Sequence, residues 1–428
     1  MAKVSGFVEW LPEQRIVELQ WMDEIRRTFE SYGFCSIETP AVEEIDALLA
    51  KGETDKEIYV IRRLQEDDRG DARLGLHYDL TVPLARYVAE HYNDLVFPFK
   101  RYQIQRVWRG ERPQEGRYRE FYQCDIDVIN NNTLPLHFDA EMPAIIYEIF
   151  KRLGISNFQL HINNRKILEG YLQGLAIEDT IPVIRILDKL DKIGRDGILS
   201  QLHSELSLTG ELAERCLALA SIQTTDSSFV EQVQNLGVKS DLLAEGLSEL
   251  EFVMSALGDL QDGVVLADLA IARGFDYYTG TVYEGKLTDF PSLGTVCSGG
   301  RYDNLAGSFI NRRLPGVGIS IGLTRLFAKL LTEQRLKVGP KCPTQVLLVL
   351  FDDARRSETM HTAQILRERG FNVEVYHTPG KQAQQLRYAS RKGIPYVWFL
   401  PYEGKGHEVK NMLSGEQFPA DPNTWKAE

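Results

Sequence analysis

The stretch RYQIQRVWRGERPQEGRYREFYQCDIDVI, residues 101–129, consists of two alternating segments separated by a loop rich in Gly, Pro and Arg. In the second segment, Tyr, Cys, Ile and Val side chains share one face, and Gln123, Asp125 and Asp127 share the other. This period of two predicts a β-strand, and residues 102–109 follow the same period. Because residues 110–119 are too many for a tight turn, we expect two antiparallel strands joined by a long basic loop.

The polar face of the second strand admits two interpretations. A half-exposed sheet at the protein surface explains the alternation without any function. However, this face carries an amide and two carboxylates, and none of the Lys, Ser or Thr residues typical of a solvated strand. A row of hydrogen-bond acceptors favours a ligand-binding face.

Charge is distributed unevenly along the 428 residues, whose net charge is −12. Residues 344–428 contain 11 basic and 10 acidic residues, so the rest of the chain carries 38 basic and 51 acidic residues. Seven of those basic residues, against two acidic ones, lie within residues 100–119. This pattern argues against a general nucleic-acid coat and suggests one specific anionic ligand. A solvated charged loop remains the plain alternative for the basic segment alone.

The five cysteines are scattered and form no CxxC pair, which does not favour structural zinc or a disulfide framework. The chain has no run of about 18 apolar residues, so we expect no membrane span. The first residues lack the apolar segment of a signal peptide. Together these features predict a cytoplasmic protein.

Hydrophobic periodicity predicts several further elements. Residues 15–33 have apolar side chains at helical spacing and end at Gly33. Pro40 interrupts a following strand, and residues 76–92 indicate a short strand leading into a helix that Pro83 could start. At 428 residues, we expect two or three domains.

The rest of the chain changes character twice. Residues 167–260 are rich in Leu, Glu and Asp, poor in aromatic residues and helical in period. Residues 337–345 form a linker interrupted by Pro and Gly. Strands then alternate with helices, which predicts a small α/β domain with a parallel sheet.

Three further segments carry polar chemistry among glycines. GVGISIGLTRL, residues 316–326, predicts a strand leading into a helix, with Arg325 either facing a ligand or lying on the surface. In CSGGRYDNLAG, residues 297–307, a tight turn explains the two adjacent glycines. IARGFDYYTG, residues 271–280, places Arg273, an Asp and two Tyr in a run that is poor material for a core.

Taken together, these segments resemble the class II aminoacyl-tRNA synthetases, and within them the histidyl-tRNA synthetase family. SYGFCSIETPAVE matches class motif 1, VWRGERPQEGRYREFYQCDIDVI matches motif 2, and GVGISIGLTRL matches motif 3. RGFDYYTG and GGRYDNL match the two signatures specific to histidine. The resemblance covers essentially the whole chain.

The resemblance implies an α/β protein with an α+β catalytic core, whose antiparallel sheet is flanked by helices. Residues 1–166 and 261–333 would form this core, and residues 167–260 a helical insertion. Residues 334–343 would be a linker to an α/β anticodon-binding domain at 344–428. Class II cores pair through motif 1, so we expect a homodimer.

The implied activity is ligation of L-histidine to its tRNA through histidyl-adenylate, with ATP as a substrate. Arg109 and Arg273 would be the catalytic cations on the α-phosphate. Glu111 would bind the adenine amine, and Arg325 the tail of ATP. We expect Mg²⁺ to be bound with ATP and no permanent metal.

The resemblance also implies a pocket for L-histidine. Asp79, Thr81 and Gln123 would bind its ammonium group, while Asp127 and Tyr278, with Tyr277 beside them, would bind its imidazole. The full set implied for histidine is Asp79, Leu80, Thr81, Arg109, Gln123, Asp127, Arg273, Tyr277 and Tyr278.

This sequence varies within the family pattern at two of these positions. It has DLT at residues 79–81 where many bacterial members have Glu-Gly-Thr, and Asp127 where many have Glu. The carboxylates are retained on shorter side chains, so we expect the same roles with a slightly shifted ligand.

On the motif 2 loop, Arg112 and Gln114 are candidates for contact with the tRNA acceptor end. Arg117 and Arg119 are either further contacts or structural residues.

Two other functions fit parts of the sequence. A catalytically inactive, synthetase-like regulatory subunit of histidine biosynthesis would share the fold, but such proteins tend to lose the phosphate-binding arginines and the anticodon domain. A class II synthetase for another amino acid would share motifs 2 and 3, but RGFDYYTG and Asp127 speak against it.

Overall fold

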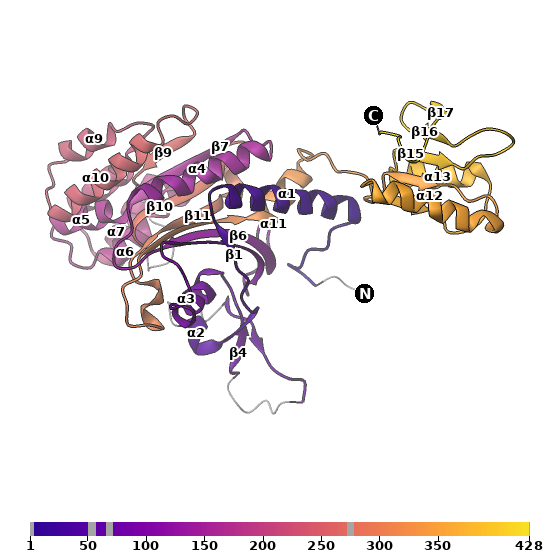
Figure 1. Cartoon of the computed structure of the whole chain (residues 1–428). Helices are drawn as coiled ribbons and strands as arrows, with labels where there is room; N and C mark the ends of the chain where they lie inside the picture. The colour runs from indigo at the N-terminus through magenta and orange to yellow at the C-terminus, as the bar shows by residue number, and fades with distance from the viewer. Residues whose placement is uncertain (1–3, 50–56, 66–71, 272–277, 428) are drawn as a thin grey trace. The chain divides into compact units, whose positions relative to one another are not determined.

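The computed structural model describes residues 4–49, 57–65, 72–271 and 278–427 (Figure 1). It divides into two compact units. The first comprises Met1–Val8 and Met22–Arg335, and the second comprises Glu9–Trp21 and Leu336–Glu428. Helix α1, Pro12–Ser31, therefore contributes residues to both units.

A nine-stranded sheet forms the centre of the first unit, in the order β1-β5-β6-β12-β11-β10-β7-β9-β8. The strands are β1 Cys35–Ser36, β5 Phe99–Trp108, β6 Glu120–Ile129, β7 Phe158–Asn164, β8 Gln223–Thr224, β9 Val265–Asp268, β10 Tyr278–Leu287, β11 Thr295–Tyr302 and β12 Gly316–Gly322. From β5 to β7 all neighbours are antiparallel, while β1 and β9 join by parallel pairing. The predicted antiparallel pair is confirmed as β5 and β6, with the loop 109–119 between them.

The apolar face of the sheet carries helix α4, His137–Arg152 (Figure 1). Ile126 of β6 and Ile319 of β12 are paired on this face, and both are buried. Arg301 of β11 crosses from the sheet to this helix, where its Nε donates to Asp139 Oδ1 at 3.0 Å. Burial of both partners makes this ion pair a fixed link between sheet and helix.

The two glycines of the GGRYDNL segment lie within strand β11, so the prediction of a tight turn is wrong. A Cβ atom at Gly299 would lie 2.1 Å from the carbonyl oxygen of Gly318 on β12. Gly is required there because two strands approach closely, and sequence spacing alone does not reveal that approach.

Helix α3, Thr81–Glu90, covers one end of the opposite, polar face. Its Leu84, Ala85 and Val88 pack in one core cluster with Phe99 of β5 and Ile129 of β6. The helix begins at Thr81, two residues before the predicted start at Pro83. The rest of the polar face is left for the site described below.

A small antiparallel sheet and a short helix precede α3. The sheet has the order β2-β4-β3. These elements are β2 Val42–Glu44, α2 Ile45–Leu49, β3 Val60–Ile61 and β4 Leu74–Leu76. Strand β4 ends at Leu76, the residue at which the short strand before the helix was predicted to begin.

The segment 167–260 is helical as predicted, with one exception. Its helices are α5 Arg165–Gly174, α6 Thr180–Leu187, α7 Leu190–Leu206, α8 Gly210–Ala220, α9 Phe229–Asn235 and α10 Asp241–Ala256. The exception is β8, which pairs with β9 and so adds an edge strand to the large sheet. Two residues are too few to give a recognisable alternation in the sequence.

The second unit contains a five-stranded sheet in the order β14-β13-β15-β16-β17. Its elements are β13 Val346–Leu348, α12 Arg356–Glu368, β14 Val373–Val375, α13 Gln382–Lys392, β15 Tyr396–Phe399, β16 Glu408–Asn411 and β17 Gln417–Pro419. The first three strands pair in parallel as expected, but β16 and β17 are antiparallel, so the prediction of a purely parallel sheet is wrong. Helix α12 packs with Leu348 and Trp398, and α13 with Leu347 and Val397.

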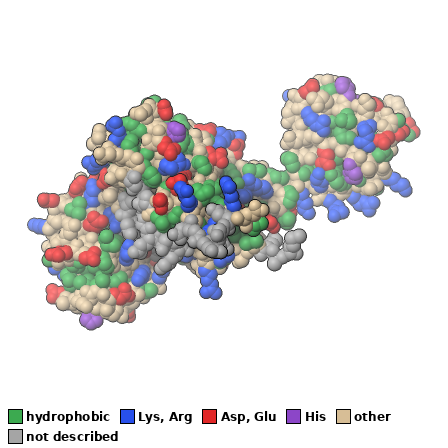
Figure 2. Space-filling model, turned by 90° about the horizontal axis from the view of Figure 1, so that it is seen from below, with side chains coloured by type: hydrophobic (Ala, Val, Ile, Leu, Met, Phe, Trp, Pro, Cys, Tyr) green, Lys and Arg blue, Asp and Glu red, His purple; other side chains and the backbone are tan. Residues whose placement is uncertain are grey.

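Basic side chains of the second unit are concentrated on one edge. Figure 2 shows Lys and Arg side chains gathered along one edge of this smaller body. Around helix α13, Lys381, Arg387 and Arg391 are all exposed. An antiparallel-rich sheet flanked by helices, followed by this α/β unit, is the predicted fold class.

Candidate active site

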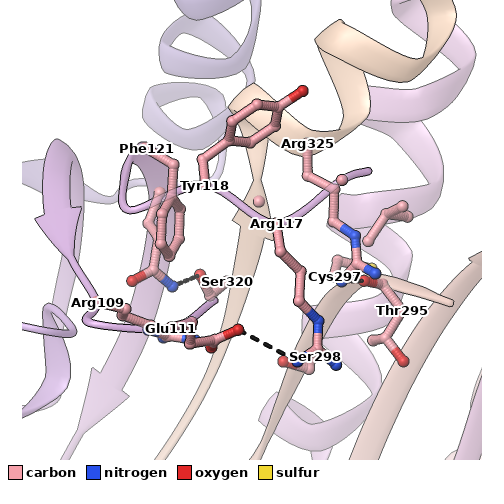
Figure 3. A pocket seen from close by; sticks show the side chains of 14 residues that line it. Arg109, Glu111, Arg117, Tyr118, Phe121, Thr295, Cys297, Ser298, Ser320 and Arg325 are labelled. Carbon is pink, nitrogen blue, oxygen red and sulfur yellow. Dashed lines mark hydrogen bonds and ion pairs between the residues drawn. The ribbon is translucent and has the colours of Figure 1, made fainter. Parts of the chain in front are cut away.

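A cavity of about 250 Å³ opens on the polar face of the large sheet, against the loop between β5 and β6 (Figure 3). Four charged side chains line it: Arg109, Glu111, Arg117 and Arg325. Gln123 of β6, Ser298 of β11 and Ser320 of β12 also line it. The cavity is therefore rich in cations and in neutral hydrogen-bonding groups, as expected for an anionic ligand.

Arg109 is fixed where β5 ends. Its Nε donates to the carbonyl oxygen of Tyr78 at 3.0 Å. Its guanidinium carbon lies 5.2 Å from the centroid of the Phe121 ring, in a cation–π arrangement. Both contacts orient the guanidinium at the cavity wall.

Glu111 and Arg117 form an ion pair across the base of the loop, with Oε2 and Nη1 3.2 Å apart (Figure 3). Backbone hydrogen bonds between Gln114 and Arg117 close a tight turn in the same loop. Gly116 in this turn has φ +71, and a Cβ there would lie 2.6 Å from Leu293 Cδ1. The glycine therefore lets the turn lie against the segment before β11 and directs Arg117 into the cavity.

Arg325 enters from helix α11, Leu323–Thr332. Its Nη1 donates to the carbonyl oxygen of Thr295 at 2.6 Å, and its Nη2 donates to that of Leu293. Burial lowers the pKa of Arg325, and the nearby Arg117 lowers it further. Since Arg325 lines the cavity, the alternative that it lies on an open surface is wrong.

Gln123 and Ser320 form part of the cavity floor. Gln123 Nε2 donates to Ser320 Oγ at 2.7 Å (Figure 3). Gln123 Oε1 is buried and has no hydrogen-bond partner among the residues that the structure describes. An unsatisfied buried acceptor at a cavity is suited to a ligand that donates N–H or O–H.

The polar face of β6 is buried, so the interpretation as a half-exposed surface sheet is wrong. Asp125 is 3% exposed and Asp127 is 4% exposed. Asp127 Oδ2 lies 2.6 Å from Arg101 Nη2, and Asp127 Oδ1 accepts from the hydroxyl of Tyr302 at 2.9 Å. Burial raises the pKa of Asp127, and Arg101 opposes that rise. Arg101 was not predicted as a site residue, although the alternation of β5 places it on the same face as Gln103, and the register places it opposite Asp127.

Asp79, Leu80 and Thr81, which are predicted to bind L-histidine, lie at the start of α3. Asp79 is 2% exposed, and its Oδ1 accepts from the backbone nitrogen of Val82 at 3.1 Å. The carbonyl oxygen of Leu80 accepts from Arg101 Nη2 at 3.5 Å. Through Arg101, this segment is joined to Asp127. Asp79, Leu80, Thr81 and Asp127 are not among the residues that line the cavity, and their roles in binding histidine stay predictions.

The remaining predicted residues fall into three places. Tyr278 begins β10, and its ring lies so close to Gly300 that a Cβ there would be 2.8 Å from Tyr278 Cδ1. Arg112 and Gln114 are exposed on the loop between β5 and β6. Arg273 and Tyr277 lie outside the described residues.

The residues that the structure describes contain no group of three or more His, Cys, Asp or Glu side chains that could hold a metal ion. They also contain no helix that is both long and apolar enough to cross a bilayer.

Comparison with known proteins shows the family. A family model described as histidyl-tRNA synthetase matches residues 6–326. The histidine–tRNA ligase of Thermobifida fusca is 59% identical over 425 residues, which cover 99% of this chain and 97% of that protein. The crystal structure of histidyl-tRNA synthetase from Nostoc sp. PCC 7120 is 39% identical with a TM-score of 0.88, and the match covers 98% of this chain and 96% of that one.

A second solved structure has the same fold at lower identity. It is described as an ATP phosphoribosyltransferase regulatory subunit/histidyl-tRNA synthetase from Bacillus halodurans, with 23% identity, a TM-score of 0.76, and coverage of 93% of this chain and 98% of that one. At that identity the likeness concerns the fold alone. The match to the family model and to a relative over nearly its full length confirm the resemblance found in the sequence, and the chain belongs to the histidyl-tRNA synthetase family.

Proposed function

We propose that this chain is a histidine–tRNA ligase, which activates L-histidine with ATP and transfers it to the 3′ end of histidine tRNA. The observation that carries the proposal is the convergence of Arg109, Arg117 and Arg325 with Glu111 in one cavity, beside Gln123. Identity of 59% to a histidine–tRNA ligase over nearly the whole chain supports it.

In the first step a carboxylate oxygen of histidine attacks the α-phosphorus of ATP. The bond from the α-phosphorus to the bridging oxygen breaks, and pyrophosphate leaves with the bonding electrons. Negative charge on the phosphate oxygens is then stabilised by fixed guanidinium groups. We assign this role to Arg109, whose orientation is fixed by Tyr78 and Phe121. Arg273 remains the predicted second cation.

The rest of the nucleotide is assigned to the other charged residues of the cavity. Arg325 and Arg117 would bind the β- and γ-phosphates, since guanidinium groups offer paired donors to phosphate. Glu111 would accept from the adenine amine, since its ion pair with Arg117 uses only Oε2 and leaves acceptor sites on the carboxylate. Mg²⁺ would enter with ATP as part of the substrate. The arginines of the cavity would neutralise the negative charge of the phosphates that is not neutralised by the Mg²⁺ bound with ATP.

In the second step a hydroxyl of the terminal adenosine attacks the histidyl carbonyl carbon, and AMP leaves. Arg112 and Gln114 are exposed on the loop beside the cavity, which supports their proposed contact with the tRNA acceptor end. The basic edge of the second unit supports anticodon binding by residues 344–428. We further propose a cytoplasmic homodimer, paired through motif 1.

The alternative of an inactive regulatory subunit is not favoured. Arg109 and Arg325 are retained and line the cavity, and the second unit is present. Tight association with a phosphoribosyltransferase in the absence of tRNA binding would revive this alternative.

The test of the proposed function is histidine-dependent exchange of labelled pyrophosphate into ATP, with Mg²⁺ present. We expect exchange with L-histidine and none with other amino acids. Absence of exchange at high protein concentration would contradict the catalytic part of the proposal.

A further inference from the structure

A second carboxylate of β6, Asp125, lies between Gln123 and Asp127 on the polar face of the sheet and has no role in the function proposed so far. In the sheet register it lies opposite Gln103 of β5 and Ser320 of β12. It is 3% exposed. A carboxylate buried to this extent needs donors, because an unpaired buried charge is costly.

The neighbours of Asp125 supply few of these donors. Gln103 Nε2 donates instead to Thr39 Oγ1 at 2.9 Å and to Gln105 Oε1 at 2.6 Å. The strongest nearby cation, Arg101, is paired with Asp127 at 2.6 Å. Asp125 Oδ1 has no hydrogen-bond partner within the part of the chain that the structure describes.

A second buried acceptor that lacks a hydrogen-bond partner among the described residues lies two positions earlier on β6. Gln123 Oε1 is buried and likewise lacks a partner among the described side chains. Since residues i and i+2 of a strand share a face, both acceptors point to the same side of the sheet. Gln123 and Ser320, the residues next to Asp125 on β6 and β12, both line the cavity, and the buried Asp125 lies between them without being among the lining residues. A carboxylate and an amide oxygen together call for a cation with several N–H donors.

We propose that Asp125 is a direct ligand of the substrate's α-ammonium group, which it binds through Oδ1 beside Gln123 Oε1. The proposal rests on the function proposed above and adds to it a specificity residue beyond those implied by the family resemblance. A primary ammonium group supplies three donors, enough for Gln123 Oε1, Asp125 Oδ1 and one of the acceptors expected at Asp79 and Thr81. A histidine analogue without its amine would leave the two acceptors of β6 buried and unsatisfied, so the site would bind it more weakly.

The protonation of Asp125 agrees with this assignment. Burial raises the pKa of Asp125 to about 7. Arg101 on β5 and the hydroxyl of Ser320 on β12 lower it, while Asp127 on the same strand and Asp79 before α3 raise it. Near neutral pH the carboxyl group is therefore partly protonated without a ligand. A bound ammonium group favours the ionised form of Asp125, so binding releases a fraction of a proton per protein molecule.

The test compares two ligands by titration calorimetry without ATP: L-histidine and 3-(imidazol-4-yl)propionate, which is histidine without its amine. For Asp125→Asn we expect at least a tenfold loss of affinity for histidine and less than a twofold loss for the imidazolepropionate. Asp259→Asn is the matched control, since it makes the same chemical change at an exposed position in the helical segment. It should leave both affinities unchanged.

Equal losses for both ligands would overturn the proposal, because Asp125 would then act on the imidazole or on the shape of the pocket. No loss for either ligand would overturn it as well. If Asp125→Asn does not fold, the wild-type protein decides: titrations at pH 7 in two buffers of different ionisation enthalpy should show more proton release with histidine than with the imidazolepropionate. Equal release would contradict the proposal.

The outcome is separable from that of the proposed function. A wild-type protein that exchanges pyrophosphate with histidine, while the Asp125→Asn variant keeps full affinity for histidine, would contradict only this inference. A wild-type protein without exchange would contradict the proposed function itself.

Discussion

At the scale of single residues, the cavity is organised by charged side chains whose donors are only partly used. Arg109 and Arg325 each donate to backbone carbonyl oxygens and keep further N–H groups for a ligand. Sequence alone predicted Arg109, Glu111, Gln123 and Arg325 as site residues, and the structure brings all four to one cavity. It left Arg117 as either a tRNA contact or a structural residue, because the direction of its side chain is set by the turn at Gly116, which the sequence does not reveal.

Replacing Arg325 tests the binding of the ATP tail. For Arg325→Ala we expect kcat/KM for ATP in pyrophosphate exchange to fall by roughly 10²-fold, since a fixed charge on the phosphates is lost. The KM for histidine should change little. Arg312→Ala is the control, because Arg312 stacks on the Tyr92 ring, 4.4 Å from its centroid, and does not line the cavity. A larger effect on histidine than on ATP would contradict the assignment.

Asp125 should also make folding stability depend on pH. Its pKa is about 7 in the folded protein, against 3.8 for an exposed Asp. Between these values the folded state holds a proton that the unfolded chain has lost, so stability falls as pH rises from about 4 to 7. Asn cannot ionise, so the free energy of unfolding of Asp125→Asn, relative to the wild type, should increase by roughly 2–3 kcal/mol from pH 5 to pH 8. Urea unfolding at both pH values measures this difference, and a difference independent of pH would argue against a raised pKa.

At the scale of secondary-structure elements, the site depends on how closely β6, β12 and β11 approach one another. The period-two alternation correctly predicted β5 and β6, because each strand has its own polar and apolar face. The glycines of β11 were misinterpreted as a turn, since the reason for them lies on another strand, at Gly318. The strands β8, β16 and β17 were missed because they are short or carry little alternation.

Gly318 offers a direct test of this close packing. A Cβ there would lie 2.1 Å from Asp127 Oδ1 and 2.7 Å from the carbonyl oxygen of Ile126. We expect Gly318→Ala to lower the free energy of unfolding by about 1–3 kcal/mol, because the buried Asp127 must shift. Gly210→Ala is the control, since nothing lies within 4 Å of a Cβ at that helix start. Equal thermal stability of the two variants would contradict the described packing.

At the scale of the whole molecule, the proposed active site lies in the first unit and the proposed anticodon-binding domain in the second. Every residue that lines the cavity lies within Met22–Arg335 of the first unit. The composition of the sequence had already indicated a separate C-terminal part, because residues 344–428 are close to neutral while the rest is strongly acidic. It did not reveal that part of helix α1 clusters with the second unit, because helical periodicity carries no information about distant packing.

This division predicts the behaviour of a chain that ends at Arg335. It should keep histidine-dependent pyrophosphate exchange within about tenfold of the full chain, because every residue that lines the cavity proposed for adenylate formation lies in the first unit. Charging of histidine tRNA should fall much further, since the proposed anticodon contacts are removed. Parallel loss of both activities in a folded protein would contradict the proposed division of labour.

The most direct test of the central claim is a crystal structure of the protein with a stable analogue of histidyl-adenylate. We predict its adenine at Glu111, its phosphate-equivalent group within hydrogen-bond distance of Arg109, and its ammonium group at Gln123 and Asp125. An analogue bound elsewhere, or bound in this cavity without contact to Arg109 and Gln123, would contradict the claim.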